Sequence, residues 1–125
     1  MNHFYSDKMI FVFGSNEAGI HGAGAAAFAH KVLGAKYGVG VCITVFTYAI
    51  PTKDFNIETL GLDKIEEYIV EFLEYARKNS DVAFNLTPIG CGLAGYNKID
   101  IMRILYKHVV PQNVMFDSRW FGFNE

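Results

Sequence analysis

Apolar positions along the chain fall into short continuous runs and into longer stretches with helical spacing. Four runs rich in β-branched and aromatic residues predict strands, because such side chains suit a pleated and buried surface. They span residues 10–13, 41–50, 82–87 and 113–116. The first run ends at Gly14, and we expect the second strand to stop at Pro51.

Three other stretches predict helices. Residues 22–33 are dense in alanine and end at Gly34, which is a favourable residue just after a helix. Residues 62–76 place leucine, isoleucine and phenylalanine at helical spacing, with glutamates between them, which indicates one buried and one solvated face. Asn97 is a suitable N-cap for a third helix that runs to about His108.

The alternation of strands and helices predicts an α/β fold with a largely parallel sheet and helices on both faces. The chain has 125 residues, of which 51% are hydrophobic, and it shows no internal repeat or linker. This length and composition fit a single packed domain over residues 1–125. In such sheets, ligands bind beyond the carboxyl ends of the strands.

Charge and composition argue against several classes of function. Eleven Lys and Arg residues against 13 Asp and Glu residues give no basic excess, which disfavours a nucleic-acid partner. We find no apolar run near the roughly 20 residues that cross a bilayer, and no signal-peptide pattern, so we expect a cytoplasmic protein without a membrane partner. The four histidines and two cysteines lack metal-ligand spacing.

Glycines gather in two loops that each follow a predicted strand and precede a predicted helix. In residues 88–96, the glycines at 90, 92 and 95 match G-x-G-x-x-G, and Asp117 follows at the distance that a dinucleotide-binding fingerprint requires. Only eight residues follow Asp117, so we do not expect a Rossmann dehydrogenase. Backbone N–H groups at a helix N-terminus nevertheless favour a phosphate. A tight turn without a ligand is the alternative.

The other glycine loop covers residues 14–25 and lacks the Gly-Lys-Ser/Thr ending of a P-loop, which binds nucleoside triphosphates. Asn16 fits either a contact with a sugar hydroxyl or an Asx-turn. His21 fits a binding or structural role better than proton transfer. Cys91, between two glycines near a helix start, fits a small turn residue better than a reactive thiol. Two facing phosphate loops suit a diphosphate.

Three ordered motifs resemble macrodomains: Phe-Gly-Ser-Asn with Gly22–Ala26, then Tyr48–Lys53, then Ile89–Gly95. Macrodomains are three-layer α/β/α modules with a mixed sheet that bind ADP-ribose. Within the family, the pattern is similar to the terminal ADP-ribose protein glycohydrolases and ADP-ribose-1″-phosphate phosphatases, and to small macro-like proteins of bacteriophages. The likeness extends over roughly residues 10–116.

The resemblance implies that both loops hold the diphosphate and the distal ribose, with Asn16 and Tyr96 near the ribose. Lys53 matches the lysine that attacks the anomeric carbon in the glycohydrolase. The ligand-binding residues that we predict are Ser15, Asn16, Gly19, His21, Gly22, Ala23, Gly24, Ala25, Ile89, Gly90, Cys91, Gly92, Leu93, Ala94, Gly95 and Tyr96.

The chain departs from the family at two places. Ala94 stands where the glycohydrolase has an aspartate that acts as acid and base, and Asp54 is a tentative catalytic substitute beside Lys53. No strand carries the Gly-Asp-Ile sequence that sets an aspartate against adenine in many macrodomains. Recognition of the base is therefore open.

Two ligand-dependent functions follow as hypotheses, beside a third, a structural or adaptor protein that has kept the fold and lost the ligand. The first is a binding module that takes ADP-ribose or another NAD-derived nucleotide as its small-molecule ligand, without a cofactor or metal; a viral protein of this kind would sequester a host immune signal in the host cytoplasm. The second is a hydrolase that removes ADP-ribose from protein or phosphate from ADP-ribose-1″-phosphate, using Lys53. The aromatic segment 118–123 fits docking on the sheet edge, contact with a base or burial in a homo-oligomer, and we favour docking.

Overall fold

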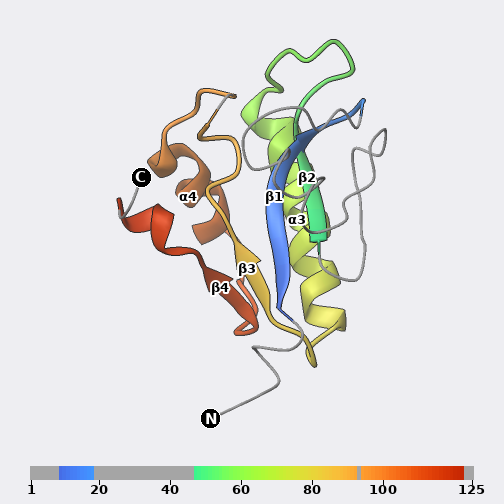
Figure 1. Cartoon of the computed structure of the whole chain (residues 1–125), viewed down its shortest axis with the longest axis vertical. Helices are drawn as coiled ribbons and strands as arrows, with labels where there is room; N and C mark the ends of the chain where they lie inside the picture. The colour runs from blue at the N-terminus through green and yellow to red at the C-terminus, as the bar shows by residue number, and fades with distance from the viewer. Residues whose placement is uncertain (1–8, 19–46, 93, 123–125) are drawn as a thin grey trace.

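The structure is a computed structural model that describes residues 9–18, 47–92 and 94–122 (Figure 1). Four strands form one sheet in the order β2-β1-β3-β4, and each neighbouring pair is parallel. The strands are β1 (Ile10–Asn16), β2 (Thr47–Lys53), β3 (Phe84–Leu86) and β4 (Val114–Phe116). The helices are α3 (Leu62–Lys78), α4 (Lys98–Tyr106) and the 3₁₀ helix η1 (Ser118–Phe121). The predicted α/β class with a parallel sheet is confirmed.

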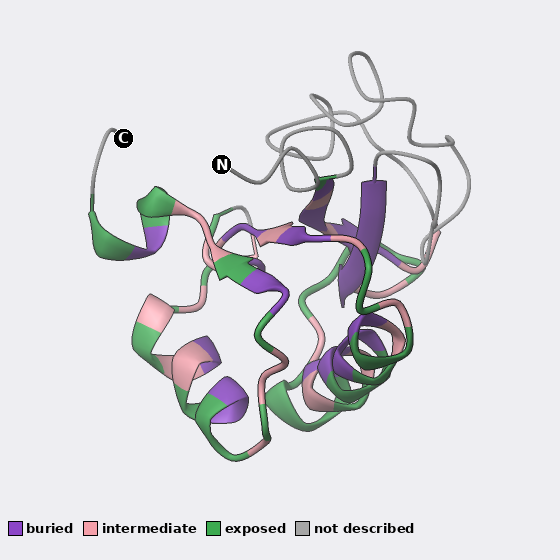
Figure 2. Cartoon of the chain, turned by 90° about the horizontal axis from the view of Figure 1, so that it is seen from below, coloured by how far each residue is buried: buried purple, intermediate pink, exposed green. Residues whose placement is uncertain are grey.

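The main core lies between one face of the sheet and the two α-helices. Figure 2 shows α3 and α4 on the same side of the sheet. Tyr48 of β2 and Phe84 of β3 pack against Phe72 of α3, with ring centroids 5.1 and 5.5 Å apart. Neither α3 nor α4, among the described residues, has the length and apolar character that a membrane span requires.

The amphipathic helix predicted at 62–76 is confirmed as α3. Its buried residues recur every three or four positions, which places them on one stripe against the sheet. They are Ile65, Ile69, Phe72, Leu73 and Ala76. The predicted helix 22–33 and the first part of the second predicted strand, residues 41–46, lie outside the described residues.

The expected end of the second strand at Pro51 is wrong, because β2 continues through Pro51 to Lys53. Proline lacks an N–H group and is confined to edge strands, strand ends and bulges. β2 is at one edge of the described sheet. Pro51 pairs with Ser15 of β1, and the register between the two strands shifts directly after this pair. This irregular strand end therefore accommodates the proline.

The aromatic C-terminal segment docks on the sheet, as we favoured from the sequence. Trp120 is buried, its indole N–H donates to the Leu86 carbonyl at 2.8 Å, and its ring packs edge-on against Phe116. Phe121 is exposed, and Phe123 lies outside the described residues.

Candidate functional site at the carboxyl edge of the sheet

The carboxyl end of β1 lies against the end of β2 and the connection from β3 to α4. Gly14, which we expected to end the first strand and open the first glycine loop, lies within β1, and a Cβ atom built on it would lie 3.5 Å from the Gly90 nitrogen, so β1 contacts the second glycine loop at this point. Glu17 N–H donates to the Lys53 carbonyl at 2.8 Å, and the Thr52 hydroxyl donates to the Ser15 carbonyl. The described start of the first loop therefore meets the second loop and Lys53 at one edge.

Residues 88–96, the amide loop hereafter, fold back on themselves. Tyr96 N–H donates to the Gly90 carbonyl at 2.8 Å, and Gly95 N–H donates to the Gly92 carbonyl at 3.0 Å. Gly90 and Gly95 have φ angles of 76° and 92°, a region in which L side chains are strained. A side chain at position 90 would also press on Ile101 of α4. Glycine is thus required at both turns.

Three amides of this loop are not used by its own fold. The N–H groups of Gly90, Gly92 and Ala94 donate no hydrogen bond within the described part of the chain. Gly90 is buried, whereas Gly92 faces open space. A buried N–H without a protein partner calls for an explanation such as a water or a bound anion. Backbone N–H groups without a protein partner are suitable donors for an anion.

The amide loop is not a helix N-terminus, which corrects our expectation for the phosphate contact. α4 begins only at Lys98, three residues after Gly95. Its own first turn is closed by a capping box, in which the Asp100 carboxylate accepts from Asn97 N–H at 3.1 Å. Asn97 is therefore the N-cap, as predicted. Any anion contact at Gly90 and Gly92 would come from the loop amides and not from the helix dipole.

Asp54 builds the turn that follows β2. One of its carboxylate oxygens accepts from the N–H groups of Asn56 and Glu58, at 2.8 and 2.9 Å. Its own N–H donates to the Glu58 carbonyl. This Asx-turn engages the carboxylate that we had considered as a substitute acid, so Asp54 has a structural role. Lys53, the other predicted catalytic residue, is partly exposed.

The segment 54–60, the β2 turn hereafter, is attached to the amide loop by two hydrogen bonds. The Thr59 hydroxyl donates to the Ala94 carbonyl at 2.9 Å, and the Tyr96 hydroxyl donates to the Leu60 carbonyl at 2.7 Å. Tyr96, predicted to lie near a ribose, therefore uses its hydroxyl to hold the turn. Thr59 and Leu60 were missed because no sequence spacing indicates a partner 35 or 36 residues away.

Cys91 is a half-buried turn residue. Burial raises the pKa of its thiol to about 11, against a smaller opposing effect of Lys98. The thiol lies 3.5 Å from the Ile89 carbonyl, to which it donates. It is therefore protonated near neutral pH, which agrees with our preference for a small turn residue over a reactive thiol.

Glu17, another residue that sequence reasoning missed, binds α3. The Tyr68 hydroxyl donates to its carboxylate. Burial, with this hydrogen bond second, raises the pKa of Tyr68 to about 12. Since Glu17 directly follows Asn16, this contact fixes the end of β1 against the helix.

The other predicted site residues fall into two groups, those that are buried at this edge of the sheet and those outside the described residues. Ser15 and Asn16 are buried at the end of β1, and Ile89 is buried before the amide loop. Within residues 9–18, 47–92 and 94–122, no cluster of His, Cys, Asp and Glu suits a metal ion. The predicted residues outside these ranges are Gly19, His21, Gly22, Ala23, Gly24, Ala25 and Leu93.

Comparisons with protein-family models, with curated proteins and with solved structures found no match for this chain.

Proposed function

We propose that the protein binds ADP-ribose or an ADP-ribose-derived nucleotide at the carboxyl edge of the sheet, as a three-layer, macrodomain-like module. The observation that carries the proposal is the set of amides at Gly90, Gly92 and Ala94 that donate to no described residue. They face the ligand edge of a parallel sheet, where α/β proteins bind nucleotides. A diphosphate offers the several acceptor oxygens that such a row of donors needs.

The position of Gly14 supports the same proposal. A Cβ atom at this position would be in ordinary van der Waals contact with Ile89 and Gly90, so the end of β1, where the first glycine loop starts, lies beside the amide loop. A ligand held by both loops would have its phosphate oxygens at the amide loop and ribose hydroxyls near Asn16. This arrangement matches the roles that the macrodomain resemblance implies for the two loops.

Binding without turnover is favoured over hydrolysis. Ala94 supplies no acid or base, and the Asp54 carboxylate accepts two backbone hydrogen bonds in its own turn. Among the residues that the structure describes, Lys53 is the remaining group that a hydrolase would use, and none of the predicted residues there is left to transfer a proton for it.

The test is calorimetric titration of ADP-ribose into the wild type, Gly92→Asp and Gly92→Asn. A side chain at Gly92 meets open space, so both variants should fold. The aspartate puts a negative charge among the amides, and we expect it to weaken binding about tenfold or more. The asparagine has the same size without the charge and should weaken binding less. Equal affinity of the two variants, or no heat with the wild type, would contradict the proposal.

A second measurement separates the binder from the hydrolase. Wild type and Lys53→Ala are incubated with protein ADP-ribosylated on glutamate and with ADP-ribose-1″-phosphate. A binding module releases neither ADP-ribose nor phosphate above background. Turnover by the wild type that Lys53→Ala abolishes would replace the binding proposal with the hydrolase.

A further inference from the structure

Glu17 places a carboxylate at the carboxyl edge of the sheet without a cation to balance it. It is half-buried, it directly follows Asn16, and its N–H donates to the Lys53 carbonyl at 2.8 Å. Within the described part of the chain, no Lys, Arg or His side chain lies at ion-pair distance from this carboxylate. Charged groups that leave water are usually paired, so the Glu17 carboxylate calls for a partner.

Lys53, on the neighbouring strand, also lacks a partner for its charge. Asn16 pairs with Lys53 in the register of β1 and β2, so Glu17 lies one residue beyond this pair. The two side chains form no ion pair with each other, and the described residues offer the Lys53 ammonium no other acceptor. Two neighbouring strands thus end on a charged acceptor and a charged donor, both with hydrogen-bonding capacity left for a ligand.

Tyr68 of α3 holds the Glu17 carboxylate in place. The Tyr68 hydroxyl donates to Oε2 of Glu17, and the Lys64 ammonium lies 5.4 Å from the centre of the Tyr68 ring. A carboxylate has about four acceptor positions on its two oxygens, and this hydrogen bond uses one of them. Oε1 therefore remains available, on a carboxylate that is already oriented and loses little freedom when a ligand binds.

We propose that the Glu17 carboxylate binds hydroxyl groups of the distal ribose and so selects a nucleotide that carries a sugar beyond its diphosphate. The inference rests on the proposed function, since it assigns the sugar end of the same ligand, which that function puts near Asn16. A hydroxyl both donates and accepts, so a sugar can donate to Glu17 while it accepts from Lys53. A phosphate has no proton to donate near neutral pH, and the carboxylate repels it.

This assignment gives the ligand one direction along the edge of the sheet. In the strand order, β1 lies between β2 and β3, and the amide loop follows β3. The distal ribose would lie at the ends of β1 and β2, and the diphosphate at the amide loop. The carboxylate then meets hydroxyl groups and the backbone N–H groups meet phosphates, so no group of the site faces a ligand group of the same charge.

The test is calorimetric titration of ADP-ribose, and of ADP, which lacks the distal ribose, into the wild type and Glu17→Ala. We expect Glu17→Ala to weaken the binding of ADP-ribose about 10- to 150-fold, the range of a hydrogen bond to a charged group. The affinity for ADP should stay the same or rise slightly, because a negative charge near the diphosphate is lost. A charge effect alone would strengthen the binding of both ligands, so a loss confined to ADP-ribose identifies the contact with the ribose.

Two further variants control for charge and for structure. Glu74→Gln removes the same charge from an exposed position near the end of α3, where Glu74 pairs with Arg77, and should leave both affinities unchanged. Tyr68→Phe removes the hydrogen bond from α3 but keeps the carboxylate, so it should weaken the binding of ADP-ribose less than Glu17→Ala does. Equal losses in Tyr68→Phe and Glu17→Ala would show that Glu17 acts only through the structure of this edge.

The outcomes separate this inference from the proposed function. If the wild type binds ADP-ribose and Gly92→Asp weakens that binding, while Glu17→Ala weakens ADP-ribose no more than ADP, the ribose contact is refuted and the binding function stands. Equal affinity of the wild type for ADP and ADP-ribose also overturns the ribose contact. The absence of any binding of ADP-ribose by the wild type refutes both.

Discussion

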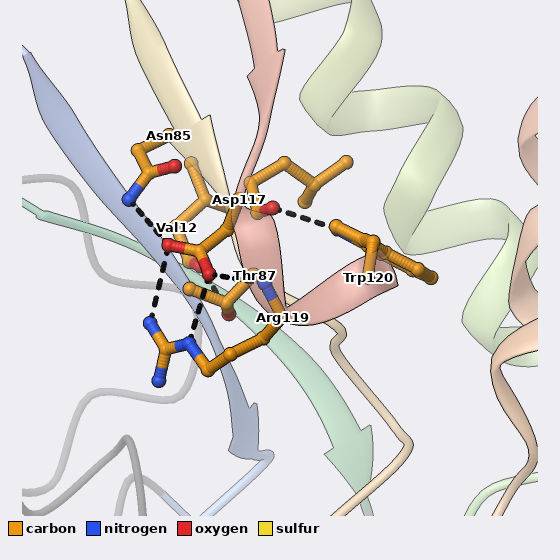
Figure 3. A network of polar contacts seen from close by, with 7 residues as sticks. Val12, Asn85, Thr87, Asp117, Arg119 and Trp120 are labelled. Carbon is orange, nitrogen blue, oxygen red and sulfur yellow. Dashed lines mark hydrogen bonds and ion pairs between the residues drawn. The ribbon is translucent and has the colours of Figure 1, made fainter. Parts of the chain in front are cut away.

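Two segments at the same edge of the sheet, one after β4 and one after β3, differ in how many of their polar groups have hydrogen-bond partners. After β4, every polar group of Asp117 and Trp120 that Figure 3 draws has a partner: the carboxylate accepts from Arg119 and Asn85, and the indole N–H donates to Leu86. After β3, the amide loop closes on itself with hydrogen bonds from the N–H groups of Cys91, Gly95 and Tyr96, and it leaves three N–H groups that donate to no described residue.

The difference separates a structural connection from a candidate binding connection. In the segment after β4, side chains satisfy the polar groups, and the buried Trp120 makes this segment part of the core. Glycines shape the segment after β3, where small residues leave the backbone accessible. Buried polar groups in native proteins are paired with few exceptions, so the exceptions indicate where a ligand or water belongs.

The largest change in the free energy of unfolding that we expect comes from the segment after β4. Trp120→Ala removes a buried ring and its hydrogen bond, and should lower the free energy of unfolding by about 3–5 kcal/mol. Urea unfolding measures this change. Phe121→Ala, which alters an exposed neighbour, should change it by less than about 0.5 kcal/mol. A small effect of Trp120→Ala would mean that the segment is not part of the core.

Low pH should remove part of the stability that the segment after β4 contributes. The hydrogen bonds from Arg119, with that from Asn85, lower the pKa of Asp117 from 3.8 to about 2. Because the folded pKa is depressed, this stabilisation is present above about pH 4 and is lost as the pH falls toward 2, by at most about 2 kcal/mol. Urea unfolding from pH 6 to pH 2 should show that Asp117→Asn lacks this part of the loss. Parallel pH profiles would contradict the assignment.

The strained backbone of the β2 turn, where Ile57 has a φ angle of 63°, predicts a substitution that raises the free energy of unfolding. Ile57→Asn places a residue that tolerates a positive φ angle at position 57 and should raise the free energy of unfolding by about 0.5–1.5 kcal/mol. Thermal and urea unfolding test it. Ile99→Asn, the same substitution at an exposed position of α4, should give no such gain. Destabilisation by Ile57→Asn would show that the isoleucine side chain contributes more than its strain costs.

The smallest change in stability should come from the amide loop itself. Gly92→Ala should alter the free energy of unfolding by less than about 0.5 kcal/mol, since a side chain there contacts nothing. Gly95→Ala, at a φ angle of 92°, is the strained counterpart, because alanine rarely adopts a positive φ angle, and it should cost more. The two variants, compared by urea unfolding, separate the glycine that the turn needs from the glycine that leaves space. Equal losses would remove that distinction.

Much of the described fold follows from sequence patterns. The helical spacing of Ile65, Ile69 and Phe72 predicted α3, and the run around Phe84 predicted β3. Asn97 was recognisable as an N-cap because asparagine is favoured at that position, and the structure adds a capping box with Asp100. Pro51 was misleading, since the exclusion of proline from strands holds for central positions and not for an irregular strand end.

The candidate site could be predicted only in part. Glycine spacing located the amide loop, because glycine marks a backbone that must turn or stay uncovered. The same pattern did not tell whether the amides would be at a helix N-terminus, and they are not. The links from Thr59 to Ala94 and from Tyr96 to Leu60 join segments about 35 residues apart, so they depend on tertiary structure that no local pattern contains.

The central claim is that the backbone of the amide loop binds the phosphates of a nucleotide. Its most direct test is a series of ¹H–¹⁵N correlation spectra of the labelled protein during titration with ADP-ribose. The claim predicts that the amide signals of Gly90, Gly92 and Ala94 are among those that move most, while the Trp120 indole signal stays in place. Saturable binding of ADP-ribose that leaves these three amides unmoved, or no change anywhere in the spectrum, would contradict it.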